Sequence, residues 1–167
     1  MSCRHKGTGD SSSTESCIVN LQVSESVSKS VQLLLSGSEV SRFCANCNRN
    51  QICNAKLTFT ILPDVLIFRL RRDQFSRKKG FEKLRDRVRC DKVVHIPSDD
   101  VLTPDTTSYD LISVIHHTGA DGAGHCTATI INGNKQGVMW RYNDSQVSKV
   151  TKLDERSAYI LFYRKSR

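Results

Sequence analysis

Hydrophobic and polar residues alternate along much of the chain, which is the pattern of half-buried β-strands. The pattern predicts strands at residues 17–23, 57–70, 88–96, 109–116, 125–131, 138–142 and 158–163. Pro63-Asp64 interrupts the second of these, and the apolar run after it is typical of a buried strand. Residues 26–35 have the spacing of a short amphipathic helix, with Ser26 or Ser28 as its cap and Gly37 at its end. The chain is therefore predicted to be an α+β protein, mainly antiparallel β with little helix.

Turn-forming residues separate these segments. Residues 1–16 are polar and read as loop, as do residues 98–108. A strand-turn-strand unit is expected around Cys44 and Cys47. Asn132-Gly133-Asn134 is a hairpin signal, so the strands on either side of it are expected to be antiparallel neighbours.

Many motif residues follow one another in a fixed order from Tyr109 onward. They are Tyr109-Asp110-Leu111, His117 to Gly119, Gly124-His125-Cys126-Thr127-Ala128, Trp140, Tyr142-Asn143-Asp144, Val147 and Ala158 to Tyr163. This series resembles the histidine box of ubiquitin-specific proteases. Cys126 departs from the pattern, because the family usually has Tyr there, and His116 stands where the family usually has Asn.

The chemistry of a cysteine protease accounts for this order. An imidazole must take the proton of a thiol, and a third residue must orient that imidazole and fix its tautomer. The resemblance implies that His125 is the general base, that Asn143 orients it, and that Asp144 assists or contributes charge. His125 opens one predicted strand and Asn143 lies on the strand that returns, so an antiparallel pair would bring them within reach.

The same resemblance implies a group of substrate-binding residues: His117, Gly119, Gly124 and Tyr142. Glycines suit a loop that a substrate backbone approaches closely, and in the family the Gly-Gly tail of ubiquitin threads through a channel there. His116 and His117 also fit a packing or loop role. Cys126 adjoins His125 on a strand, so its side chain should point to the opposite face, which argues against it as nucleophile.

The middle of the chain extends the resemblance. Leu62 to Arg72 (LPDVLIFRLRR) is similar to the strand that the family writes as Leu-Pro-x-x-Leu-x-x-x-Leu-Lys-Arg, and Lys83-Leu84 and Val94 to Pro97 match the segment after it. The resemblance implies a papain-like cysteine protease fold with its thumb missing. Residues 1–60 would form the fingers portion and residues 61–167 the palm with the histidine box.

Seven cysteines, without a secretion signal, make a disulfide framework improbable and raise the question of metal binding. Cys44 and Cys47 have the C-x-x-C spacing at which two thiolates share one zinc ion. The upstream partner pair of the family is incomplete here, with Cys3 and His5 as candidates. The alternatives are a structural zinc site that includes Cys44, Cys47 and Cys3, and reduced turn cysteines without metal. No cofactor is required for the predicted chemistry.

The chain carries a net charge of +8, and many of its basic residues lie between Arg69 and Lys92. This run contains two aromatic residues and no nucleic-acid motif, so basic strand edges are favoured over nucleic-acid binding. No apolar run is long enough to span a membrane, and the N-terminus has no secretory pattern. A cytoplasmic or nuclear protein, without a membrane partner, is expected.

The family's cysteine box has no counterpart in this sequence, so the chain as given is expected to lack the nucleophile. One hypothesis is a part of a deubiquitinase that hydrolyses the isopeptide bond after the C-terminal glycine of ubiquitin. A second is a catalytically inactive ubiquitin-binding protein. A third, a zinc-dependent nucleic-acid binder, would show affinity that falls steeply with salt. The expected partners are ubiquitin and ubiquitinated proteins.

Overall fold

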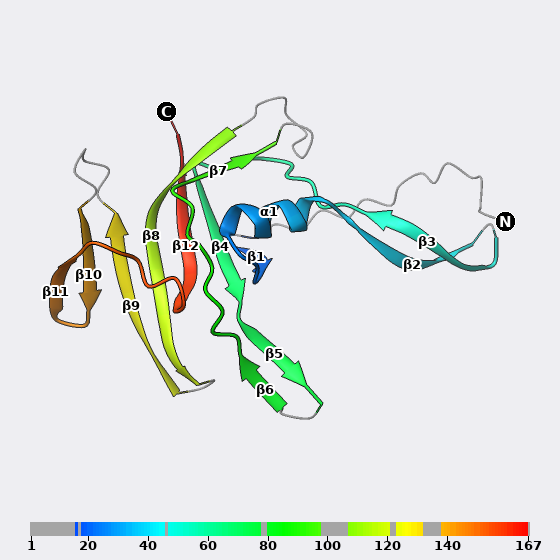
Figure 1. Cartoon of the computed structure of the whole chain (residues 1–167). Helices are drawn as coiled ribbons and strands as arrows, with labels where there is room; N and C mark the ends of the chain where they lie inside the picture. The colour runs from blue at the N-terminus through cyan, green and yellow to red at the C-terminus, as the bar shows by residue number, and fades with distance from the viewer. Residues whose placement is uncertain are drawn as a thin grey trace.

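One large sheet and two separate hairpins contain all the described strands of this computed structural model (Figure 1). The structure describes residues 16, 18–45, 47–77, 80–97, 107–120, 123–131 and 138–166. Its elements are β1 (Val19–Gln22), α1 (Val27–Leu35), β2 (Ser38–Cys44), β3 (Arg49–Ala55), β4 (Val65–Arg71), β5 (Asp73–Ser76), β6 (Gly80–Lys83), β7 (Val93–Ile96), β8 (Thr107–Ala120), β9 (Ala123–Ile131), β10 (Met139–Asn143), β11 (Gln146–Val150) and β12 (Ala158–Lys165). Within the described part of the chain, no helix is long and apolar enough to cross a membrane.

The large sheet has the strand order β1-β4-β12-β8-β9-β10-β11, and β7 pairs with the first residues of β8 beside this path. Among the pairs of described strands, β1 and β4 are parallel and the others are antiparallel. The last strand in the sequence, β12, lies between β4 and β8. The predicted dominance of antiparallel β structure is therefore confirmed.

The two faces of the sheet differ in burial. On β4, Leu66, Phe68 and Leu70 are buried, whereas Ile67 and Arg69 between them are half-buried. We call the side of Leu66, Phe68 and Leu70 the core face, and the opposite side the outer face. The buried side chains of α1 belong to the same hydrophobic core as those of the core face. The buried apolar residues are Leu21, Val27, Val31, Leu35, Leu66, Phe68, Leu70, Val88, Cys90, Val94, Ile96, Tyr109, Leu111, Val114, Ala158, Leu161 and Tyr163.

The helix α1 begins and ends as its sequence predicts. Ser26 has extended backbone angles, and its side chain accepts a hydrogen bond from the Lys29 amide at 3.1 Å, as an N-cap does. Val27, Val31 and Leu35 are buried on one side of the helix at intervals of four residues. Gly37, just beyond the helix, has a φ of 79°, a backbone conformation that glycine adopts without strain.

Two strand predictions were too long. Residues 57–64 lie outside the described strands, with only an isolated bridge at Phe59, and Pro63 offers no amide to a ladder. In residues 88–96 only β7 is a strand. The amides before it bond to loops: Val88 N donates to Glu155 O at 3.3 Å, and Arg89 N donates to Glu25 O at 3.0 Å within an isolated bridge to Ser26.

Some predicted features had other outcomes. The strands β5, β6 and β11 were not predicted individually. The strand β8 continues to Ala120 and β9 starts at Ala123, with residues 121–122 outside the described part. The loop at residues 1–15, most of the 98–108 loop and the hairpin signal at 132–134 also lie outside the described residues.

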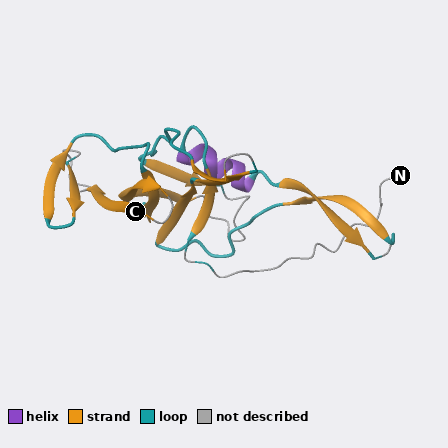
Figure 2. Cartoon of the chain, turned by 90° about the horizontal axis from the view of Figure 1, so that it is seen from below, coloured by secondary structure: helices purple, strands orange, loops and turns teal. Residues whose placement is uncertain are grey.

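The hairpin β2–β3 projects away from the sheet, at the end opposite to β10 and β11 in both views (Figures 1 and 2). Its ladder pairs Ser41 with Ile52 and Phe43 with Asn50. Phe43 and Ile52 therefore share one face of the hairpin, where they are 63% and 73% exposed. An exposed pair of large apolar side chains on a projecting hairpin is suited to contact with another molecule.

A buried arginine fastens two loops to the end of β4. The side chain of Arg72 has no solvent exposure, and burial lowers the pKa of its guanidinium. Its nitrogens donate to four carbonyl oxygens, those of Ala158 (2.7 Å), Asp86 (2.8 Å), Glu155 (3.0 Å) and Leu84 (3.1 Å). These carbonyl oxygens replace the water that the buried cation has lost.

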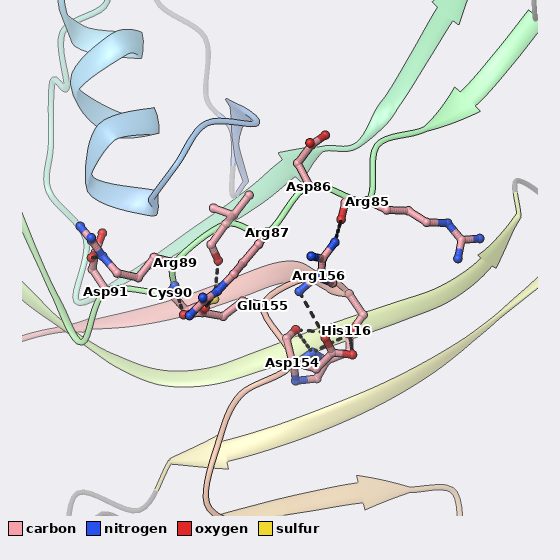
Figure 3. A network of polar contacts seen from close by, with 12 residues as sticks. Arg85, Asp86, Arg87, Arg89, Cys90, Asp91, His116, Asp154, Glu155 and Arg156 are labelled. Atoms are coloured by element: carbon pink, nitrogen blue, oxygen red, sulfur yellow. Dashed lines mark hydrogen bonds and ion pairs between the residues drawn. The ribbon is translucent and has the colours of Figure 1, made fainter.

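The side chain of Glu155 also joins these two loops (Figure 3). Its carboxylate accepts hydrogen bonds from Arg87 Nε at 2.6 Å and from the Cys90 amide at 3.0 Å. Arg156 Nη1 also donates to Arg85 O at 3.4 Å. The segment that leads into β7 is thus attached to the segment that leads into β12 by these side-chain contacts and by the backbone bond from Val88 to Glu155, without a strand ladder.

Candidate functional site

The strands β9 and β10 place His125 and Asn143 on the same face of the sheet. Tyr142 is paired with Ala128, so one further step along both strands sets Asn143 opposite Thr127. His125 is the diagonal neighbour of that pair, on the core-face side, because residues two apart on a strand share a face. A bond from Arg141 Nη2 to Thr127 Oγ1, at 3.2 Å, lies on this same face.

The two side chains are in direct contact. His125 Nε2 lies 2.5 Å from Asn143 Oδ1. Since the amide oxygen of Asn143 can only accept, Nε2 is the nitrogen that carries the hydrogen. In the neutral imidazole, Nδ1 is then the unprotonated nitrogen, and it is available to take a proton. The contact that the sequence predicted between His125 and Asn143 is present in the structure.

Asp144 lies farther from the imidazole. Its Oδ2 is 3.8 Å from His125 Nε2, and the side chains of His125 and Asp144 are 50% and 80% exposed. Asp144 is the first residue of the two-residue turn between β10 and β11, and it has a φ of 49°. A carboxylate so exposed is strongly screened by water, so its effect on His125 is weaker than that of the Asn143 contact.

Three of the residues predicted to bind substrate lie on the face of the sheet opposite to His125. His117 is paired with Cys126, and Tyr142 with Ala128, which sets His117, Gly124 and Tyr142 on the outer face, opposite His125. Tyr142 is 40% exposed. Cys126 is also exposed on the outer face, so its thiol points away from His125, as predicted.

Contacts within the protein explain why Gly119 and Gly124 have no side chain. Gly119 has a φ of 109°, and a Cβ there would lie 2.6 Å from the carbonyl oxygen of Ala123. A Cβ on Gly124 would lie 2.0 Å from His117 Nε2 and 2.8 Å from Thr118 O. The imidazole of His117 therefore rests directly on Gly124, the residue before His125.

His117 itself is held from three sides. Lys83 Nζ contacts its Nδ1 and donates to its carbonyl oxygen at 2.9 Å. Its amide donates to Ser157 O at 2.9 Å, and its ring lies 5.6 Å from that of Tyr159. Lys83 had no part in the predicted site, although Lys83-Leu84 belongs to the segment that matched the family pattern.

His116 is a packing residue on the core face. Packing was one of the two roles predicted for it, the other being a loop role. It is 1% exposed, and its Nε2 lies 2.9 Å from Thr129 Oγ1. Its Nδ1 lies 3.2 Å from both Asp154 O and Ser157 Oγ. Burial, followed by the nearby charge of Arg141, lowers the pKa of His116. This imidazole is therefore neutral near pH 7.

The candidate zinc ligands are only partly described. Cys44 ends β2 and Cys47 lies in the turn after it, and both are half-buried. Cys3 falls outside the described residues. Cys53 is paired with Val40, four residues along β2 from Cys44, which is roughly 13 Å and too far for one metal ion. Among the described residues no group of three or more metal-ligating side chains occurs, so two of the four ligands of a tetrahedral site would have to come from elsewhere.

Comparison with known proteins identifies the family. The sequence model of the family described as ubiquitin carboxyl-terminal hydrolase matches residues 4–163. The chain belongs to this family, which is a family of deubiquitinases, and the predicted relationship is confirmed.

Several curated relatives share this region. Ubiquitin carboxyl-terminal hydrolase 10 of Arabidopsis thaliana is 34% identical in an alignment 137 residues long that covers 75% of this chain and 14% of that protein. Ubiquitin carboxyl-terminal hydrolase 15 of Homo sapiens is 34% identical in an alignment 140 residues long that covers 77% of this chain and 13% of that protein. Ubiquitin carboxyl-terminal hydrolase 4 of Bos taurus is 30% identical, over 92% of this chain and 19% of that protein. The chain thus spans less than a fifth of the length of each of these relatives.

Solved structures support the fold. The SAGA Ubp8/Sgf11/Sus1/Sgf73 DUB module bound to ubiquitin aldehyde contains a chain that matches with a TM-score of 0.75 at 21% identity, over 90% of this chain and 36% of that one. Another structure of the module matches with a TM-score of 0.64 at 21% identity, over 89% and 33%. The predicted fold, a mainly antiparallel part of the ubiquitin-specific protease fold, is confirmed.

Proposed function

We propose that this chain supplies the general-base part of a cysteine-type deubiquitinase site. The observation that carries the proposal is the contact of His125 Nε2 with Asn143 Oδ1 at 2.5 Å. This contact fixes the tautomer that a general base needs, and it leaves Nδ1 of the half-exposed side chain to accept the proton of a thiol. Membership of the deubiquitinase family supports the same role.

The proposed chemistry is acyl transfer. Nδ1 of His125 takes the proton of a cysteine thiol, and the thiolate attacks the carbonyl carbon of the C-terminal glycine of ubiquitin. The imidazolium then returns the proton to the departing lysine amine of the isopeptide bond, which leaves a thioester. Water, deprotonated by the same Nδ1, hydrolyses this thioester. Cys126 faces away from His125, so the thiol would come from a segment outside the described residues.

Ubiquitin is the proposed partner, and the hairpin β2–β3 is a proposed contact with it. A matching solved chain belongs to a module bound to ubiquitin aldehyde, which supports this assignment. Phe43 and Ile52 offer exposed apolar surface on the projecting hairpin. No step of the proposed reaction depends on zinc at Cys44 and Cys47.

The second candidate function is ubiquitin binding without catalysis. The orientation of Cys126 favours it, because the described cysteine next to His125 in the sequence cannot act as its nucleophile. In that case His125 and Asn143 would be retained without a reaction to perform, and binding surfaces such as β2–β3 would carry the function.

The test uses the full-length natural protein that contains this segment. His125→Ala and Asn143→Ala are compared with His95→Ala, a control at an exposed histidine on β7. Hydrolysis of a fluorogenic ubiquitin amide gives kcat and KM, and fluorescence anisotropy gives the affinity for labelled ubiquitin. Loss of a general base should lower kcat by about a hundredfold to ten-thousandfold while the affinity stays unchanged.

Three outcomes are distinct. A drop in kcat with His125→Ala and none with His95→Ala supports the proposed reaction. An active protein in which His125→Ala retains full kcat contradicts it. A wild-type protein that binds ubiquitin but neither hydrolyses the amide nor reacts with a ubiquitin C-terminal electrophile supports the binding function instead.

A further inference from the structure

The starting observation is a chain of contacts that ends at His125. Lys83 touches His117, His117 lies on Gly124, and Gly124 precedes His125 on β9. Lys83 ends β6 of the hairpin β5–β6, a separate two-stranded sheet that Figure 1 shows beyond the end of β4. A residue on one hairpin thus contacts the segment that carries the proposed base on another.

The backbone next to Lys83 is held in place by hydrogen bonds. The next residue, Leu84, donates its amide to Arg72 O at 2.7 Å, and its carbonyl oxygen accepts from Arg72 Nη1 at 3.1 Å. Arg72 is fully buried at the end of β4. The ammonium of Lys83 therefore projects from an anchored backbone, and less of its freedom is lost when it binds His117.

The contact sets the state of the His117 ring. An ammonium can only donate, so Nδ1 of His117 must accept, and Nε2 carries the hydrogen in the neutral ring. The second bond, from Nζ to the His117 carbonyl oxygen at 2.9 Å, holds the same residue through its backbone. The ring of Tyr159 lies beside it, tilted by 43° with the two ring centroids 5.6 Å apart. With these partners, His117 has little room to rotate.

The ring of His117, held in this way, limits the movement of the Gly124 backbone. The position of a Cβ on Gly124 is 2.0 Å from His117 Nε2, so the ring occupies the space that a side chain would need. The backbone at Gly124 can move toward the outer face only if the ring moves first. The position of His125 along the sheet therefore depends on the ring of His117.

We propose that Lys83 is a positioning residue for His125, acting through His117 and Gly124. This inference rests on the proposed function of His125. It also reassigns His117 from direct substrate binding to support of β9. Lys83 touches no reacting atom, and its effect is on the alignment of the base.

The experiment compares three variants of the full-length natural protein. Lys83→Met removes the ammonium and keeps the length of the side chain, Lys83→Arg keeps a cationic donor, and Lys92→Met is the matched control at an exposed lysine. Hydrogen–deuterium exchange followed by mass spectrometry reports on residues 117–126, whether or not the protein is active. Steady-state hydrolysis of the fluorogenic ubiquitin amide reports kcat and KM.

We expect Lys83→Met to speed exchange in residues 117–126 by roughly tenfold, because a charge-assisted contact to this segment is lost. We expect kcat to fall by about tenfold to a hundredfold with little change in KM, as misalignment of a base does. Lys83→Arg should restore part of both effects, and Lys92→Met should match the wild type.

Unchanged exchange in residues 117–126 of Lys83→Met would overturn the inference, whatever the activity. A wild-type kcat in Lys83→Met would also overturn it, provided that His125→Ala inactivates the same protein and that exchange outside residues 117–126 is normal. If the wild-type protein has no hydrolytic activity, the proposed function of His125 fails separately, and the exchange data alone decide whether Lys83 positions β9.

Discussion

Replacing Arg72 by methionine should destabilise the protein severely, and the structure indicates by how much. The change removes four hydrogen bonds, to three carbonyl oxygens of two loops and to that of Ala158, the first residue of β12. Hydrogen bonds to charged groups contribute about 1.5–3 kcal/mol each, but the guanidinium also costs several kcal/mol to bury. The net loss of stability should be about 3–5 kcal/mol. For a protein of this size, 1 kcal/mol shifts the melting temperature by about 2–4 °C, so Arg72→Met should lower it by roughly 10 °C.

The neighbouring residue provides the control. Arg71 is exposed at the end of β4, and Arg71→Met removes the same charge without breaking a buried contact. Its effect should stay within about 0.5 kcal/mol. Differential scanning fluorimetry gives the melting temperatures, and hydrogen exchange of residues 84–90 and 153–161 locates the change. An Arg72→Met protein that melts within one degree of Arg71→Met, with unchanged exchange in these loops, would refute the reasoning.

Two further predictions concern titratable groups. Because burial lowers the pKa of His116, the unfolded state binds more protons once the pH falls through about 6.5, and stability should fall on acidification. The melting temperature should drop between pH 7.5 and pH 5.5, and the slope should flatten in His116→Asn; an equal slope would contradict the assignment. Burial raises the pKa of Cys90 to about 12, so iodoacetamide at pH 8 should alkylate exposed Cys53 and Cys126 well before Cys90, as peptide mass spectrometry can measure. Equal labelling rates would show that Cys90 is accessible.

Local features of the fold could be predicted from the sequence because they depend on neighbouring residues. The helix α1 has its serine cap, its apolar spacing and its terminal glycine within twelve residues, and all three are present in the structure. The strand β11 escaped prediction because its residues are nearly all exposed, so its pattern has no buried side to mark it. The position of β12 between β4 and β8 depends on contacts between distant segments, which no local pattern encodes.

In the candidate site too, some contacts could be predicted from the sequence and others could not. The contact of His125 with Asn143 followed from two adjacent strands joined across a hairpin signal, and the family resemblance gave each residue its expected role. Lys83 and His117 are 34 residues apart and lie on hairpins of different sheets, so their contact could not be inferred from spacing. The placement of His117 and Tyr142 on the outer face required the register of the strands.

The central place of β12 has a consequence for synthesis. A ribosome completes β4 and β8 long before it reaches residues 158–165, yet these two strands meet only through β12. Until that segment emerges, each presents an open hydrogen-bonding edge flanked by apolar side chains, to which foreign strands can attach. A stop codon shortly before Ala158 would therefore remove the strand that connects β4 with β8, not merely a tail, and would leave the two parts of the sheet without a ladder between them.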